Sequence, residues 1–123
     1  GACSLAFSPD SAHLAVGMAN GNVNIVDGAT LQFFKRLITS EASIPVADLK
    51  YAPNGKVLAA ASHLSIDLFD VTSNYTKLGR CSGHTATVSH LDWSVDSKVL
   101  FSNCNSYEML YWDRSCRQVK ANQ

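Results

Sequence analysis

The sequence predicts an all-β protein made of three similar units, each a small sheet of four short antiparallel strands. Two independent sets of residues recur along the chain with nearly the same spacing. The first set is a turn triplet that follows an aromatic residue: Phe7 before Ser8-Pro9-Asp10, Tyr51 before Ala52-Pro53-Asn54, and Trp93 before Ser94-Val95-Asp96. The second set is an aspartate that closes a short apolar segment: Asp27, Asp70 and Asp113. The triplets lie 44 and 42 residues apart and the aspartates 43 apart, so both sets indicate one period of about 43.

Each unit begins with a short strand and a tight turn. In "SLAF" (4–7) and "HLDW" (90–93) apolar residues alternate with others, which is the period-2 pattern of a half-buried strand. The triplet that follows has turn chemistry, most clearly in Pro53-Asn54-Gly55. Proline fixes φ, and Asn-Gly readily adopts positive φ, so the chain is expected to reverse here.

The next three strands of each unit are shorter apolar runs. Strand-length runs follow each triplet: "HLAVG" (13–17), "KVLAAAS" (56–62) and "KVLFSN" (98–103). The third strands end in the recurring aspartate: "NVNIVD" (22–27), "SIDLFD" (65–70) and "EMLYWD" (108–113). The fourth strands are less distinct: "LQFFKRL" (31–37), "YTKLGRC" (75–81) and "CRQVKA" (116–121). Asn20-Gly21 predicts a hairpin turn, and since no window shows a helical stripe, we expect no helices.

Four short strands every 43 residues are typical of a WD40 β-propeller blade, whose repeat runs about 40–45 residues. Val26, Phe69 and Trp112 point away from their apolar neighbours, so both faces of the third strands need cover, which radial stacking of blades provides. We assign residues 1–123 to a portion of one propeller, with repeats at 1–43, 44–86 and 87–123. Because the smallest propellers have about four blades, we expect a partial propeller that closes no ring and belongs to a longer chain.

Residues 81–113 carry a more specific pattern. They contain Gly83-His84, then His90-Leu91-Asp92-Trp93-Ser94, and finally Leu110-Tyr111-Trp112. This stretch resembles the echinoderm microtubule-associated protein-like (EML) family, which has Gly-His, an "ITHLDWS" strand and "YEILYW" in the same order. The first repeat, "SLAFSPDSAHLAVG", and the second, "LKYAPNGKVLAAAS", are similar to blades of that family in a more generic way. The resemblance implies a propeller protein of the cytoplasm and cytoskeleton that binds tubulin or microtubules, with the cilium axoneme as a second location.

Three residues are candidates for a structural hydrogen-bond network within the third blade: His84, Trp112 and Ser106. The resemblance implies that an aspartate in a tight turn joins the histidine to the strand tryptophan. Here Asn105-Ser106 stands where the family has Gly-Asp, and since a serine accepts more weakly than a carboxylate, we expect a weaker network. The first two repeats lack Gly-His, and Glu41 fills that place in the second, so these blades are expected to depend more on packing.

The pattern predicts no catalytic, cofactor or metal site. His90, Asp92 and Ser94 alternate on one strand face and point in parallel about 7 Å apart, whereas a Ser-His-Asp triad needs hydrogen-bond contact. We therefore expect Ser94 and Asp96 to stabilise a turn. The histidines show no metal-ligand spacing, and the recurring aspartates at strand ends are expected to cap turns.

The composition argues against two classes of partner. The 123 residues carry a formal net charge of zero, which does not predict nucleic-acid binding, and no apolar run is long enough to cross a membrane. The N-terminus has no signal-peptide pattern. The four cysteines, Cys3, Cys81, Cys104 and Cys116, form no Cys-x-x-Cys pair, and we expect free thiols, although an even number allows two disulfides.

The leading functional hypothesis is a non-catalytic segment of a microtubule- or tubulin-associated propeller that presents a rigid surface. Other axonemal or cytoskeletal proteins are further candidate partners, and the contacting loops are not specified by the pattern. Lys35-Arg36 and Lys77 with Arg80 lie near the outer strands and could attract acidic tubulin tails, or they could form ordinary solvated surface. The alternative is a generic WD40 scaffold subunit of another multiprotein complex.

Overall fold

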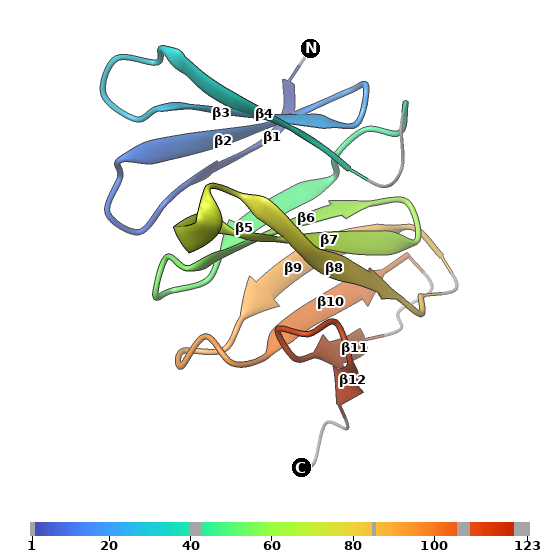
Figure 1. Cartoon of the computed structure of the whole chain (residues 1–123). Coiled ribbons are helices and arrows are strands. Elements are labelled where there is room, and N and C mark those ends of the chain that lie inside the picture. The colour runs from blue at the N-terminus through green and yellow to red at the C-terminus, as the bar shows by residue number, and fades with distance from the viewer. Residues whose placement is uncertain (1, 40–42, 85, 106–108, 120–123) are drawn as a thin grey trace.

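The computed structural model describes residues 2–39, 43–84, 86–105 and 109–119. Three four-stranded antiparallel sheets lie one above another (Figure 1). The first sheet contains β1 (Ala2–Phe7), β2 (His13–Met18), β3 (Asn22–Asp27) and β4 (Phe33–Ile38). The second contains β5 (Asp48–Tyr51), β6 (Val57–Ser62), β7 (Ser65–Asp70) and β8 (Thr76–Ser82). The third contains β9 (Val88–Trp93), β10 (Leu100–Cys104), β11 (Met109–Trp112) and β12 (Gln118–Val119).

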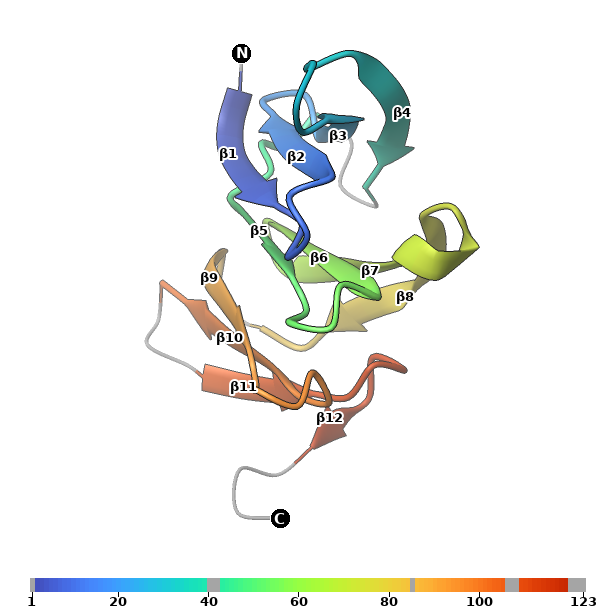
Figure 2. The ribbon, with the colours of Figure 1, turned by 90° about the vertical axis from the view of Figure 1, so that its left-hand side faces the viewer.

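Within each sheet the strands lie in chain order, so every neighbour in the sequence is also a neighbour in space. Figure 2 shows β1, β5 and β9 on one side of the stack and β4, β8 and β12 on the other. The three sheets thus have matching inner and outer edges. The predicted all-β fold, a partial WD40 propeller of three four-stranded antiparallel blades that closes no ring within the described residues, is confirmed.

One short helical turn interrupts the β structure. The 3-10 helix η1 (Val71–Ser73) joins β7 to β8, and the described residues contain no α-helix. Asp70 precedes the turn and accepts a hydrogen bond from the Thr72 N–H, while Asn74 ends it in the left-handed conformation with φ of 60°. The strand pattern did not indicate this turn, because three residues are too short to show a helical period.

The first turn of each sheet repeats the same local chemistry. The side-chain oxygen at the third position of the triplet accepts the backbone N–H two residues later, as Asx turns do. The bonds are Asp10 to Ala12 (3.0 Å), Asn54 to Lys56 (3.0 Å) and Asp96 to Lys98 (3.1 Å). As expected, Ser94 and Asp96 stabilise this turn in the third sheet, where the Ser94 hydroxyl donates to Oδ1 of Asp96 at 2.6 Å. The sequence predicted these turns from residue type alone.

The core has two layers, one on each face of the second sheet. All six residues of β6 are buried, and consecutive residues alternate between the layers. Leu58 and Phe69 pack toward the first sheet, whereas Ala59 and Leu68 pack toward the third. The second sheet therefore has both faces covered, as a blade inside a propeller does.

Each of the two end sheets has only one face covered by a neighbouring sheet. The far face of the first sheet leaves Leu5 and Phe7 of β1 more than half exposed, and Ile38 of β4 is 64% exposed. On the far face of the third sheet Met109 is 50% exposed. Apolar strand faces of this kind are covered by adjacent blades in a propeller.

Candidate functional site

A buried hydroxyl joins two predicted site residues in the third sheet. Nε1 of Trp112 donates to Oγ of Ser102 at 2.8 Å, and Nε2 of His84 lies 2.6 Å from the same oxygen. All three side chains are at most 6% exposed. The structure thus brings His84 and Trp112 together through Ser102, while Ser106 lies outside the described residues.

Donor and acceptor rules define how this network is satisfied. An indole N–H can only donate, so the Ser102 oxygen accepts from Trp112 and can give its own proton to His84. This arrangement requires that the imidazole proton of His84 lie on Nδ1. Each buried polar group named here has a partner, as buried groups require.

The strands and the preceding loop position this network. Ser102 on β10 and Trp112 on β11 lie on the face that packs against the second sheet. Gly83 precedes His84, and a Cβ atom at this glycine would lie 3.0 Å from Cη2 of Trp112. A glycine at this position lets the chain pass close over the indole ring.

Sequence reasoning missed Ser102. The available signal was a small polar residue two positions from Leu100 on an apolar strand, and therefore on its buried face. A buried tryptophan also requires a partner for its N–H. Together these two facts could have identified a serine acceptor behind the third strand.

A different polar chain joins the first and second sheets. The hydroxyls of Tyr51 and Tyr75 lie 2.7 Å apart, and Oη of Tyr75 lies 2.9 Å from Nδ1 of His13 on β2. His13 also stacks on Phe34 with ring centroids 5.1 Å apart. Burial, assisted by the hydrogen bond with Tyr75, raises the pKa of Tyr51 far above its usual range. Both tyrosines are therefore neutral hydrogen-bonding groups at physiological pH.

The inner strands are joined from sheet to sheet by bonds that follow the repeat spacing. Oδ2 of Asp48 accepts the Leu91 N–H at 2.9 Å, and Nε1 of Trp93 donates to the Lys50 carbonyl at 3.0 Å. Leu91 lies on β9, the inner edge strand of the third sheet, whose outward N–H groups lack a strand neighbour within that sheet. The carboxylate of the neighbouring sheet satisfies one of these groups and fixes the spacing of the two sheets.

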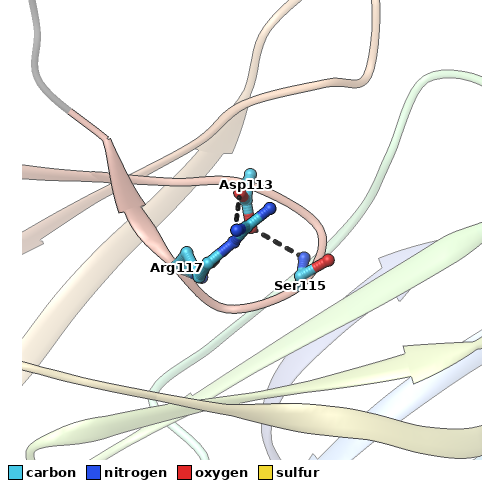
Figure 3. Close-up of polar contacts among 3 residues, drawn as sticks. All are labelled: Asp113, Ser115 and Arg117. Carbon is cyan, nitrogen blue, oxygen red and sulfur yellow. Dashed lines mark hydrogen bonds and ion pairs between the residues drawn. The ribbon is translucent and has the colours of Figure 1, made fainter.

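The recurring aspartates cap the outer loops. In Figure 3 the Asp113 carboxylate faces Ser115 and Arg117. Its Oδ1 accepts the N–H groups of Ser115 at 2.8 Å and Arg117 at 3.0 Å, and Nε of Arg117 lies 3.3 Å from Oδ2. Burial raises the pKa of Asp113, but the N–H bonds and the Arg117 charge outweigh this effect and lower it. Asp27 and Asp70 likewise accept N–H groups of the loops that follow them.

His90 and Ser94, which alternate with Asp92 in the sequence, bind different partners and form no catalytic triad. His90 lies beside an open groove of ≈ 420 Å³ on the far face of the third sheet, where Phe101 and Tyr111 pack edge to face. Nδ1 of His90 lies 3.2 Å from the Ser89 hydroxyl, whereas the Ser94 hydroxyl is bonded to Asp96. Ser94 is therefore engaged in its turn and not with His90.

The basic residues of the outer strands occupy β4 and β8. Arg36 on β4 and Arg80 on β8 are exposed. Nζ of Lys35 donates to the Asn74 carbonyl, and Nζ of Lys77 lies 3.6 Å from the fully buried Asp67. Part of this basic charge therefore serves contacts within the protein.

The described part of the chain contains no candidate membrane-spanning helix and no candidate metal site. No helix in these residues has the length and apolar character needed to cross a membrane. The same residues contain no group of three His, Cys, Asp or Glu side chains placed to hold a metal ion.

Three sheets with matching edges and a His–Ser–Trp network behind a third strand define a segment of a WD40 β-propeller. A family model described as "Echinoderm microtubule-associated protein second beta-propeller" matches residues 1–123. The chain therefore belongs to the echinoderm microtubule-associated protein family.

Individual relatives agree with this family. The chain is 40% identical over 120 residues to echinoderm microtubule-associated protein-like 1 of Mus musculus, covering 92% of the chain and 14% of that protein. It is 36% identical over 124 residues to the 77 kDa echinoderm microtubule-associated protein of Lytechinus variegatus, covering 97% of the chain and 18% of that protein. Human echinoderm microtubule-associated protein-like 3 is 37% identical over 120 residues, with 93% of the chain and 13% of that protein covered. The chain thus spans less than a fifth of the length of these relatives.

Proposed function

We propose that this chain is a non-catalytic propeller segment that helps a microtubule-associated protein bind tubulin or microtubules. The observation that carries the proposal is the match of the whole chain to one propeller of a family named for microtubule association. This match favours the microtubule hypothesis over a generic WD40 scaffold in another complex. The segment acts in the cytoplasm at the cytoskeleton, and its axonemal occurrence with further cytoskeletal partners belongs to the same proposal.

Rigidity is the physical contribution of the segment. Residues 1–43, 44–86 and 87–123 act as three consecutive blades of one propeller, held in fixed relation by bonds between sheets. Two kinds of bond support this: the Asp48 carboxylate on the Leu91 N–H, and the Tyr51–Tyr75–His13 chain. A surface that loses little conformational entropy on binding retains more of its contact energy, which favours binding to a partner such as a microtubule.

The hydrogen-bond network of the third blade serves this rigidity. His84, Ser102 and Trp112 brace the strands behind the outer loops, and Ser106 remains a predicted member. Because the network is buried, its role is structural, and partner contacts come from the exposed outer strands and loops.

The outer strands supply a charge that suits tubulin. Arg36 and Arg80 are exposed on β4 and β8, which lie on the same side of the stack. An exposed basic edge steers an acidic partner toward the protein, and this attraction weakens as salt screens it.

Co-sedimentation of the full-length protein with polymerised microtubules tests the proposal. At low ionic strength we expect the protein in the pellet, with the bound fraction falling as salt is raised. Tubulin treated with subtilisin, which lacks the acidic tails, is the matched control and should retain less protein. Full-length protein that stays in the supernatant at low ionic strength would contradict the proposal.

A further inference from the structure

Two cysteines from different sheets lie next to each other in the core between the second and third sheets. Cys81 belongs to β8 and is 1% exposed, while Cys116 lies in the loop between β11 and β12 and is half-buried. Both pack on the same apolar cluster, and the two thiols lie close enough to influence each other's ionisation. All four cysteines lie in the described part of the chain, and no disulfide joins them.

Gly79 creates the space that brings the two sulfurs together. A Cβ atom at Gly79 would lie 3.0 Å from Sγ and 3.6 Å from Cβ of Cys116. Gly79 and Cys81 are two residues apart on β8, so they face the same side of the strand. The Cys116 side chain therefore lies against the strand face from which the Cys81 thiol projects.

The loop that carries Cys116 is held in a fixed shape. The Asp113 carboxylate accepts the N–H groups on both sides of Cys116, those of Ser115 and Arg117 (Figure 3). The Cys116 N–H itself donates to the Asp113 carbonyl at 3.1 Å. Cys116 has a φ of 64°, a left-handed conformation that a non-glycine residue keeps only where its surroundings impose it. The loop conformation therefore holds the Cys116 thiol against β8.

The two thiols differ in environment. The neighbouring Cys81 thiol lowers the pKa of Cys116, which outweighs the opposing effects of partial burial and of the Asp67 and Asp113 charges. The neighbouring Cys116 thiol, followed by burial, raises the pKa of Cys81. The thiolate is the nucleophile of cysteine chemistry, and Cys116 is also the more accessible of the two. Cys116 is therefore suited to react first, with Cys81 as the buried thiol that resolves the product.

The fold itself does not require this pair. One repeat earlier, at the junction of the first and second sheets, Leu37 occupies the position of Cys81, since Leu37 pairs with Val23 as Cys81 pairs with Ile66. Leu37 is buried there as an apolar side chain, so the equivalent outer strand is built without a thiol. The pair of thiols is thus a feature of the junction between the second and third sheets and not of the junction between the first and second.

We propose that Cys81 and Cys116 form a peroxide-reactive dithiol that closes into a disulfide between the second and third sheets. The Cys116 thiolate attacks one oxygen of hydrogen peroxide and breaks the O–O bond, which leaves a sulfenic acid on Cys116 and releases water once the leaving oxygen is protonated. The Cys81 sulfur then attacks the Cys116 sulfur, gives up its proton, and displaces the hydroxyl as a second water. Two thiols lose two electrons, and one peroxide is reduced to two waters. A dithiol reductant reverses the bond by exchange.

The bond would lock the third blade to the second. A disulfide restrains the unfolded and partly opened states, so separation of the two sheets becomes harder. Oxidation would therefore stiffen the outer edge of this junction.

Peptide mapping of the full-length protein tests the proposal. The protein is treated with hydrogen peroxide, remaining thiols are alkylated without reductant, and the digest is analysed by mass spectrometry. We expect a disulfide-linked peptide pair containing Cys81 and Cys116 that disappears after dithiothreitol. Cys104→Ser, which alters a buried cysteine elsewhere in the third sheet, should leave the yield unchanged.

Gly79→Ala provides a sharper control because it keeps both thiols. The added methyl would occupy the space of the Cys116 sulfur, so the yield of the linked peptide should fall several-fold. Hydrogen exchange of β6 and β7 amides shows whether this variant retains the core. The proposal is overturned if wild-type protein yields Cys81 and Cys116 only as alkylated or over-oxidised single residues. It is also overturned if Gly79→Ala, with native exchange, gives the wild-type yield.

Discussion

At the scale of the residue, one hydroxyl determines how the third blade satisfies its buried polar groups. Ser102 accepts from the Trp112 indole and lies 2.6 Å from Nε2 of His84. A buried donor without a partner costs about 1–3 kcal/mol of folding free energy, so Ser102 stabilises the fold mainly by satisfying the groups around it. The aromatic ring of Trp112 supplies packing, and the serine makes that packing compatible with an N–H in the core.

Replacement of Ser102 by alanine should destabilise the third sheet. Ser102→Ala leaves the Trp112 N–H and His84 Nε2 without their shared partner, and we expect a loss of about 1–3 kcal/mol. Hydrogen exchange of the full-length protein, measured on peptides from β10 and β11, reports this loss as a lower protection free energy.

Ser89→Ala is the matched control for that measurement. Ser89 also lies in the third sheet, but its hydroxyl makes only long contacts, 3.4 Å to the Asn103 carbonyl and 3.2 Å to Nδ1 of His90. Its removal should change protection by less than about 0.5 kcal/mol, as surface substitutions usually do. Equal effects of the two substitutions would contradict the role given to Ser102.

The sequence predicted this site in part. The pairing of His84 with Trp112 rested on a family resemblance and on the need of a buried indole for a partner. The serine between them was missed, because a serine within "VLFSNC" does not reveal its role by residue type, and the signal was only its place two residues from Leu100. The strand register, with Leu100 opposite Trp112 and Ser102 opposite Leu110, puts it on the buried face.

At the scale of the element, the first turn of each sheet shows how a motif tolerates a change of charge. Asp10 and Asp96 hold this turn in the first and third sheets, and neutral Asn54 holds it in the second with the same bond. The geometry therefore needs a side-chain oxygen, and the charge adds a separate, pH-dependent contribution.

The pH dependence of Asp96 can be predicted in sign. The Ser94 hydroxyl, and after it the Lys98 N–H, lower the pKa of Asp96. A carboxyl with a lowered folded-state pKa adds stability above its unfolded pKa of about 4 and loses it as pH falls through the folded value. Asp96→Asn should keep the turn, as Asn54 does, and lose this contribution.

Thermal unfolding of the full-length protein between pH 7 and pH 2 measures the effect. Wild-type protein should unfold at a slightly higher temperature than Asp96→Asn at pH 7, and the difference should vanish in acid. A difference that persists or grows as the pH falls would show that Asp96 acts through geometry and not through charge.

Strands were more predictable than the elements that join them. Period-2 alternation and the 43-residue repeat located all three sheets, because half-buried strands impose that alternation on the sequence. The turn η1 and the bonds between sheets were not predictable, since Asp48 and Leu91 meet only after two sheets pack. Interactions within a repeat leave a local pattern, whereas interactions between repeats depend on their relative placement.

At the scale of the whole molecule, the three sheets form a stack whose inner edges are tied together and whose outer edges are exposed. Inner-edge bonds at Asp48 and Lys50 fix the second and third sheets relative to one another. The outer edge carries exposed Arg36 and Arg80. The exposed arginines can therefore contact a partner without loss of the inner-edge bonds.

The central claim is that this segment itself contributes to microtubule binding. The segment covers only 14% of the mouse relative, so its own contribution has to be separated from that of the rest of the protein. A substitution within the segment tests the claim more directly than the presence of the full-length protein in a pellet. Arg36→Glu reverses an exposed charge on β4, and Lys98→Glu makes the same change in an exposed turn of the third sheet. Unchanged thermal unfolding of both variants verifies that the fold is retained.

The measurement is microtubule affinity of the full-length variants by co-sedimentation at low ionic strength. We predict that Arg36→Glu weakens binding roughly two- to five-fold, the change that about 0.4–1 kcal/mol of exposed-charge interaction produces, and that Lys98→Glu has a smaller effect. Wild-type affinity in Arg36→Glu, or equal weakening in both variants, would contradict a specific contact through the outer strands of this segment.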